Sequence, residues 1–245
     1  VYVIEANPRA SRTVPFISKA TGVPLAKMAA RIMAGEKIGE LGLPDDAREL
    51  DRFCMKEAVM PWGRFPGAEV ILGPEVMGIA KSYPEAYAKT QLAIDYRLPT
   101  PADGKVFISV CDRDKRHILS HARILRHLGF DIVSTEGTAR VLAGGNVKCE
   151  VVEKISGPHG GERENVGDMI AEGKIAFVIN TPYGPGSRSD GYLLRTEAVR
   201  RGVTCLTALS AAGAFIAAVE AAREGGEGAA APGAGMDVIA LQDLA

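Results

Sequence analysis

The chain has 245 residues, of which 47% are hydrophobic and 24% charged, and its net charge at pH 7 is −1. This composition is typical of a folded protein with one large or two modest domains, and no stretch approaches the roughly 18 consecutive apolar residues of a membrane span. Because binding to nucleic acid or to an anionic membrane depends on an excess of basic residues, the near-zero net charge excludes both as general partners.

Four cysteines are spread along the chain and form no C-x-x-C pair; they are Cys54, Cys111, Cys149 and Cys205. We interpret them as buried free thiols of a protein in a reducing compartment. No charged-then-apolar signal segment opens the sequence, so the cytoplasm is the expected location. The first residue, Val1, falls inside an apolar run, which we interpret as the mark of a fragment or a processed piece.

The first 97 residues contain separate strand and helix patterns. A short apolar run at residues 1–4 predicts a strand, and a polar loop follows it. Pro24 opens a predicted helix in which apolar residues recur at helical spacing, and residues 53–60 predict another strand. Ser82 and Glu85 form a capping box for a helix that extends to about residue 94.

Residues 98–104 combine two prolines with a glycine and predict a linker. Beyond it, strand patterns alternate with helix patterns. The strands are expected at 105–111, 131–135, 149–155, 175–181 and 204–209, and the helices near 115–128, 138–143, 165–173, 191–201 and 211–224. Five successive strand–helix units predict an α/β domain over 105–226, with a flavodoxin-like, five-stranded parallel sheet that is doubly wound. Residues 227–245 predict a flexible low-complexity segment and a C-terminal tail.

Polar residues that suit a metal and a phosphate follow the first predicted strand. Glu5 and Asn7 offer oxygen ligands, and Arg9, Arg12 and Lys19 offer positive charge. Residues 1–35 contain five basic residues against one acidic residue, which would suit a small polyanionic ligand. A solvated basic surface is the alternative interpretation.

A second polar set follows the strands of the predicted parallel sheet. It consists of two lysines, four threonines and an asparagine, namely Lys115, Thr135, Thr138, Lys154, Asn180, Thr181 and Thr207. Ligands of open parallel sheets bind beyond the carboxyl ends of the strands, where helix N-termini also point. The set therefore predicts a site for a phosphate monoester. Taken singly, each threonine or asparagine could instead cap a helix, and each lysine could face water.

Other motifs carry weaker signals. A P-loop and a G-x-G-x-x-G fingerprint are both absent from the sequence, which argues against P-loop nucleotide or nicotinamide binding. His117 and His121 could hold a metal, but no third ligand is evident and a place beside the helix core is favoured. His159, in a glycine-rich loop, could be an acid–base group or a solvated side chain.

Residues 4–22 resemble the ATP-grasp signature near the end of the second synthetase half of the carbamoyl phosphate synthase large subunit. The resemblance continues through Lys56-Glu57, Phe65-Pro-Gly67, Gly73-Pro-Glu75 and Val76-Met-Gly78. From about residue 105 onward, the sequence resembles the methylglyoxal-synthase-like regulatory domain of that subunit. The resemblance implies a C-terminal fragment of an ATP-grasp domain at 1–97, followed by an allosteric domain.

The resemblance also implies roles for individual residues. Glu5 and Asn7 would bind Mg²⁺ or Mn²⁺ on the phosphates of the substrate ATP, and Arg9 and Arg12 would contact those phosphates during catalysis. The site of a nucleotide effector's phosphate would consist of Lys115, Thr135, Thr138, Lys154, Asn180 and Thr181. Lys56, Glu57 and Thr207 would lie at an ornithine effector site.

Several partners follow from the same resemblance: the upstream part of the large subunit, a glutamine amidotransferase small subunit, nucleoside monophosphate and ornithine effectors, and further large subunits in an oligomer. The intact enzyme would be an ATP-dependent, glutamine-hydrolysing ligase of arginine and pyrimidine biosynthesis. Because part of the ATP-grasp site would lie upstream, the fragment alone is expected to be inactive.

The sequence departs from the family at two places. The loop after Glu75 is about six residues short, and Pro182 replaces a hydroxyl residue of some relatives. A free-standing lyase is one alternative, because residues 156–162 resemble methylglyoxal synthase around its catalytic aspartate. The matching residue here is Glu162, whose extra methylene would displace the carboxylate. A purely regulatory nucleotide-binding module is the other alternative.

Overall fold

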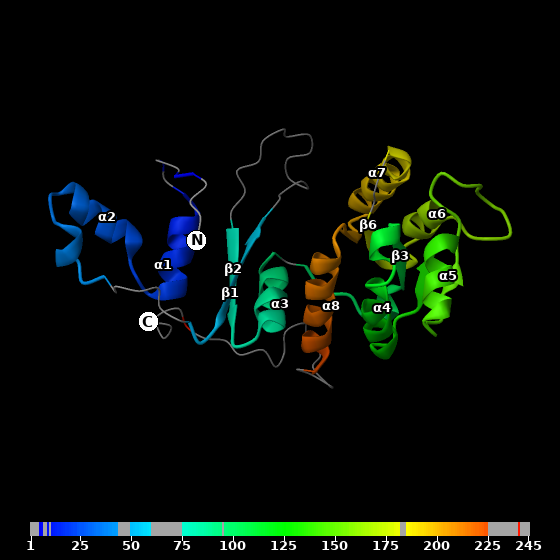
Figure 1. Cartoon of the computed structure of the whole chain (residues 1–245), viewed down its shortest axis with the longest axis horizontal. Coiled ribbons are helices and arrows are strands. Elements are labelled where there is room, and N and C mark those ends of the chain that lie inside the picture. Colours follow the sequence, from blue (N-terminus) through cyan, green and yellow to red (C-terminus); the bar gives the residue numbers. More distant parts are fainter. Residues whose placement is uncertain are drawn as a thin grey trace. The chain divides into compact units, whose positions relative to one another are not determined.

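The computed structural model describes residues 5, 6, 9, 11–43, 50–59, 75–94, 96–181, 185–224 and 240, without the side chains of 185–189 and 224. Several predictions lie outside the described residues, namely the strand at 1–4, the roles of Asn7 and Pro182, the motifs within 60–74, and the tail after 227 apart from Ala240. The described chain divides into unit 1, which runs up to Tyr96 and includes Ala240, and unit 2, from Arg97 to Glu224. Figure 1 shows them in blue to cyan and in green to orange.

Unit 1 contains more regular structure than the sequence pattern predicted. Its elements are α1 (Thr13–Thr21), α2 (Leu25–Met33), a short 3-10 helix (Ile38–Glu40), β1 (Phe53–Ala58), β2 (Glu75–Ala80) and α3 (Tyr83–Ala93). The prediction of a polar loop before Pro24 was wrong for Thr13–Thr21, which form α1. The Ser18 and Thr21 hydroxyls donate to carbonyls four residues earlier, both at 2.8 Å, so they do not compete with the helix. Gly22 then ends α1 in the left-handed conformation, with φ 72°.

Strands β1 and β2 pair antiparallel, and α3 packs against them. The packing is close at Gly78, where a Cβ atom would lie 2.0 Å from the carbonyl oxygen of Ala86. Only glycine allows this approach of strand and helix. The structure confirms Ser82 as the N-cap of α3, because its side chain accepts a hydrogen bond from the Glu85 N–H. It shows only this half of the predicted capping box, and the Glu85 carboxylate lies 3.3 Å from Lys89 Nζ.

Unit 2 is built on five parallel strands, which confirms the predicted α/β class and five-stranded parallel sheet. They are β3 (Lys105–Val110), β4 (Ile132–Ser134), β5 (Glu150–Val151), β6 (Ile175–Thr181) and β7 (Thr204–Leu206). The spatial order is β5-β4-β3-β6-β7. Numbered within the domain, this order is 3-2-1-4-5, whereas flavodoxin itself has 2-1-3-4-5. The third strand is also much shorter than the predicted 149–155.

The helices of unit 2 cover both faces of this sheet. They are α4 (Ile118–His127), α5 (Glu136–Gly144), α6 (Val166–Ala171), α7 (Pro185–Arg200) and α8 (Leu209–Glu224), with 3-10 turns at Pro101–Asp103 and Asp112–Asp114. Helix α4 contacts α5 and α8, whereas α6 contacts α7 (Figure 1). The strand order reverses between β3 and β6, which is where open parallel sheets bind ligands.

The two units differ in how much apolar surface they bury. Phe177 of unit 2 is fully buried, with its ring centroid 5.8 Å from that of Phe130 and 5.1 Å from that of Phe215. On the other face, Phe107 and Val178 pack against Met169 of α6. In the described part of unit 1, the buried apolar residues are four alanines and Leu41. No described helix is long and apolar enough to span a membrane.

Replacing Phe177 by Ala should destabilise unit 2 by about 3–5 kcal/mol, because it removes a ring that two other rings enclose and leaves a cavity. Denaturant unfolding followed by circular dichroism measures this change. Tyr192→Ala is the matched control, since that aromatic residue is 64% exposed and its loss should cost less than about 0.5 kcal/mol. Equal losses for the two variants would contradict the assigned core.

Candidate functional site

Two adjoining cavities lie at the carboxyl ends of β3, β4 and β6. The first has a volume of about 640 Å³ and is lined by residues that include Phe107, Cys111, Val166, Asn180, Thr181, Asp190 and Leu194. The second, of about 500 Å³, is lined by residues that include Lys115, Glu136, Gly137, Thr138, Arg140, Glu153 and Arg163. Ser109, Val110, Thr135 and Lys154 line both cavities. The pair can therefore accommodate one ligand with two chemically different ends.

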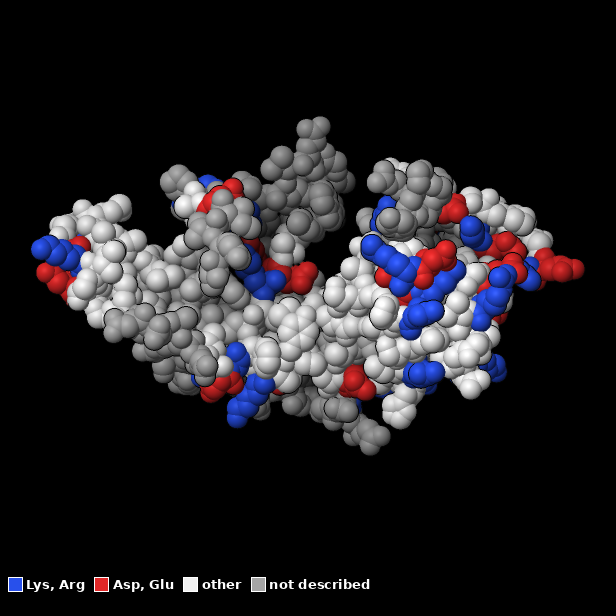
Figure 2. Space-filling view, viewed as in Figure 1, with Lys and Arg blue, Asp and Glu red and all other residues white. Residues whose placement is uncertain are grey.

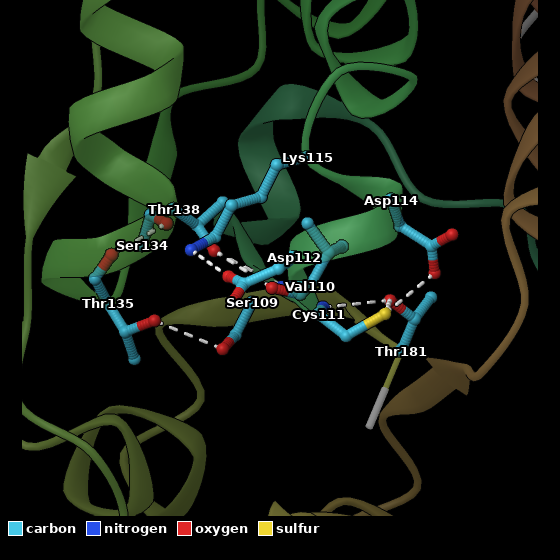
Figure 3. Close-up of polar contacts among 10 residues, drawn as sticks. All are labelled: Ser109, Val110, Cys111, Asp112, Asp114, Lys115, Ser134, Thr135, Thr138 and Thr181. Atoms are coloured by element: carbon cyan, nitrogen blue, oxygen red, sulfur yellow. Dashed lines mark hydrogen bonds and ion pairs between the residues drawn. The ribbon is translucent and has the colours of Figure 1, made fainter. Parts of the chain in front are cut away.

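Hydroxyl groups from three strand ends meet at the end of β3 (Figure 3). The Ser109 and Thr135 hydroxyls lie 3.0 Å apart, between the two cavities. The Thr138 hydroxyl accepts from the Val110 N–H at 3.2 Å, and the Thr181 hydroxyl accepts from the Cys111 N–H, also at 3.2 Å. Thr138 and Thr181 thus hold the backbone that frames the site, while Ser109 and Thr135 lie within it.

Lys115 lies against the N-terminus of α5. Its Nζ atom is 3.4 Å from the point where a Cβ atom on Gly137 would sit. The N-terminus of a helix has a partial positive charge, so a lysine beside it is unfavourable unless an anion lies close to both. Asp112 supplies that charge here, since its Oδ1 is 2.5 Å from Lys115 Nζ (Figure 3). The hydrogen bond from Lys115 lowers the pKa of Asp112.

Lys154 belongs to a loop that a buried amide organises. Asn165 is 1% exposed, and its Nδ2 donates to the carbonyl oxygens of Lys154 at 2.8 Å and Gly157 at 3.1 Å. Its Oδ1 accepts from the Gly167 N–H at the start of α6. These bonds fix the backbone of Lys154 at the rim, and its ammonium lies 3.9 Å from the Asp190 carboxylate.

Asn180 lines the first cavity and has a buried side-chain amide. Its Nδ2 donates to the Ser109 carbonyl at 2.9 Å, and because a carbonyl only accepts, this bond fixes the orientation of the amide. The Oδ1 atom is consequently the free end, and it is buried without a partner in the described structure. An acceptor left in this state favours a ligand with an O–H or N–H group. Asp190 adds a carboxylate to the same cavity.

The structure brings six of the predicted effector residues to this rim: Lys115, Thr135, Thr138, Lys154, Asn180 and Thr181. Thr207 is exposed after the end of β7 and lines neither cavity. Sequence reasoning missed Ser109, Asp112 and Asp190. Asp112 lies three residues before Lys115, a spacing that could have indicated the ion pair, but Asp190 reaches the site only through the position of α7.

The predicted residues of unit 1 have varied surroundings. Glu5, Arg9 and Arg12 are exposed in the segment before α1. Lys56 is tied into the fold, since its Nζ lies 3.4 Å from Thr13 Oγ1 and 3.3 Å from the Glu75 carboxylate.

Glu57 is half-buried on β1 and accepts from Gln91 Nε2 at 3.4 Å. Partial burial raises the pKa of its carboxyl. Burial, with Glu57 as the next contributor, also raises the pKa of Tyr87 to about 12. Glu57 therefore belongs to a polar cluster of limited solvent access.

The histidines show no cluster typical of a metal centre, and no group of three or more potential ligands occurs among the described residues. His121 Nδ1 lies 3.2 Å from the His117 carbonyl oxygen. His159 Nδ1 lies 2.9 Å from an Asp168 carboxylate oxygen, and both side chains are largely exposed. Glu162 is exposed and lines neither cavity.

Comparison with known proteins gives two family matches. Residues 1–41 match the family described as carbamoyl-phosphate synthase L chain, ATP binding domain, and residues 117–207 match the family described as MGS-like domain. The carbamoyl phosphate synthase large chain of Methanothermobacter thermautotrophicus is 46% identical over 231 residues, which cover 92% of this chain and 21% of the relative.

Two further relatives, from Methanocaldococcus jannaschii and Methanopyrus kandleri, are named carbamoyl phosphate synthase large chain, C-terminal section. They are 42% and 45% identical over 92% of this chain, which spans 38% and 43% of their lengths. The chain thus spans about a fifth of the full-length relative and less than half of each section. Over 92% of its length, the chain is similar to carbamoyl phosphate synthase large chains, and two of these relatives are C-terminal sections of that chain.

Proposed function

We propose that unit 2 is the regulatory domain of a carbamoyl phosphate synthase and that its two adjoining cavities bind one phosphorylated nucleoside. The position of Lys115 carries this proposal. The Lys115 ammonium lies against the N-terminus of α5, where a phosphate monoester would be stabilised by the lysine and by backbone N–H groups together. Thr135 and Lys154, which line the same cavity, add a hydroxyl and a second cation.

The lining of the first cavity favours a ligand in which a nucleoside is attached to the phosphate, rather than phosphate alone. Its walls include the apolar side chains of Phe107, Val166 and Leu194, which suit a base. Its polar lining residues, Asn180 and Asp190, suit sugar hydroxyls and ring N–H groups. A fully ionised phosphate has no proton to donate to either side chain, so we assign Asn180 to the nucleoside end.

Unit 1 would contribute the last part of an ATP-binding site. Glu5 and Asn7 have the hard oxygen ligands that Mg²⁺ or Mn²⁺ prefers, and Arg9 and Arg12 would stabilise negative charge on ATP as the γ-phosphate is transferred to carbamate. Glu5 and Asn7 would hold the divalent ion, which would supply positive charge to offset the negative charge of the phosphates. The chain's own part in this step is to hold the phosphates and to orient them.

Unit 1 would need the preceding part of the large chain to complete both the site and its own core. No residue of α2 is buried, and Met33 at its end is 81% exposed. A helix with an apolar stripe usually buries it against another element. We therefore propose that the upstream part of the ATP-binding domain covers this face, and that the chain alone makes no carbamoyl phosphate.

The remaining partners are proposed from the family. A glutamine amidotransferase subunit would supply ammonia, large subunits would associate, and the cytoplasm would be the location, with products feeding arginine and pyrimidine synthesis. Glu57 and Thr207 are the proposed ornithine contacts, with Lys56 beside Glu57 already engaged by Thr13 and Glu75. A lyase function is not favoured, because Glu162 lies outside the lining of both cavities.

Lys115→Ala should weaken the binding of uridine or inosine monophosphate by about 10- to 100-fold, as expected for a lost hydrogen bond between two charged groups. Isothermal titration calorimetry on the whole chain measures this. Arg123→Ala is the matched control, because it also removes one positive charge. The Arg123 side chain is exposed, donates to the Gly145 carbonyl and lines neither cavity. Equal losses in both variants, or none in Lys115→Ala, would reject the site.

Glu5→Gln, introduced into a large chain that includes the rest of the ATP-binding domain, should lower the rate of carbamoyl phosphate formation on the order of 100-fold. The reason is the loss of a charged ligand to the divalent ion. Raising the Mg²⁺ concentration should restore part of the rate. Glu36→Gln, at an exposed carboxylate paired with Arg31, should retain full activity. Unchanged activity in Glu5→Gln would reject the proposed role of unit 1 in the reaction.

A further inference from the structure

The cations around the second cavity are paired with carboxylates. Lys115 lies 2.5 Å from Asp112, Arg140 lies 3.3 Å from Glu136, and Arg163 lies 3.9 Å from Glu153. Lys154, shared with the first cavity, lies 3.9 Å from Asp190. Figure 2 shows blue and red atoms side by side over unit 2 rather than a patch of one sign. The charge of the rim is therefore balanced by the chain itself.

Asp112 differs from the other three carboxylates in what it neutralises. Its partner, Lys115, is the cation that lies against the first turn of α5, so Asp112 provides the negative charge that this position requires. The Asp112 side chain is 94% exposed, whereas that of Lys115 is only 24% exposed. The carboxylate can thus turn away into solvent, while the lysine stays in place.

We propose that Asp112 is an internal competitor of the ligand's phosphate for Lys115, and that it sets the affinity of this site. The inference rests on the proposed function of the cavities. A phosphate that reaches Lys115 must either displace the Asp112 carboxylate or bind next to it. Displacement breaks a short ion pair, and binding beside it brings two anions together, so both routes weaken binding. For a weakly charged ligand, the binding free energy from a contact with Lys115 would be too small to displace the Asp112 carboxylate.

The decisive variant is Asp112→Asn, which keeps the shape of the side chain and removes its charge. We expect it to bind inorganic phosphate and uridine monophosphate about two- to fivefold more tightly than the unmodified chain, the range expected for an exposed ion pair. The gain should shrink as salt is raised from 20 to 300 mM, because salt screens exposed charges. Calorimetry on the whole chain measures both effects.

Asp131→Asn provides the matched control. Asp131 is also exposed, at 73%, and pairs with Arg126 at 2.5 Å, but it precedes β4 at the opposite end of the strands. Both variants change the net charge by one unit, so a general electrostatic effect would strengthen binding equally. Equal gains in the two variants, or unchanged or weaker binding in Asp112→Asn, would overturn the competitor role.

A second readout separates this inference from the proposed function. Carbon-13 NMR of the Asp112 carboxyl should show its pKa rising from the lowered value towards the ordinary one as phosphate is added, because phosphate takes Lys115 from it. Binding that requires Lys115 but leaves the Asp112 pKa unchanged would reject the competitor and keep the site. Failure of phosphate and nucleotide to bind either form would reject both.

Discussion

The carboxyl end of β3 is the point on which the arrangement of the site depends. Four neighbours are hydrogen-bonded to Ser109, Val110 and Cys111 at this end; they are Thr135, Thr138, Asn180 and Thr181. Because β3 lies between β4 and β6, these bonds connect the two halves of the sheet where the strand order reverses. The strand end thereby fixes the distance between the helix N-terminus at α5 and the acceptors of the first cavity.

The same constraint explains why polar residues occur at strand ends that are otherwise buried. Thr138 and Thr181 are 2% and 3% exposed, and their hydroxyls accept from the backbone N–H groups of Val110 and Cys111 at the end of β3. The Cys111 N–H also donates to the Thr181 carbonyl of β6, at 3.0 Å. Leaving such N–H groups unpaired in a buried place would be costly. Thr138 therefore contributes to the fold whether or not a ligand is bound. In contrast, Asn180 Oδ1 has no partner in the described structure, and Lys115 is paired with the exposed Asp112 carboxylate.

Much of unit 2 could be predicted from its sequence, because alternating strand and helix patterns leave few topologies. The rule that ligands bind at strand ends then selected Lys115, Lys154 and Asn180, which the structure places around two adjoining cavities. The order of the strands and the place of Asp190 depend on how α7 crosses the sheet, and no local pattern contains that information. In unit 1, α1 was missed because its threonine and serine residues suggested a loop, and their back-bonding hydroxyls are visible only in the folded chain.

The two units differ in how much apolar surface they bury, and the chain spans only part of the length of its relatives. Unit 2 encloses large aromatic residues and a complete set of strand ends, while the described part of unit 1 buries mainly alanines.

The most direct test of the nucleotide site is amide NMR of the whole chain titrated with uridine monophosphate. We expect the largest shifts at the backbone amides of Glu136 and Gly137 and at the side-chain amide of Asn180. Saturable binding that leaves these three signals unmoved would contradict the proposed site.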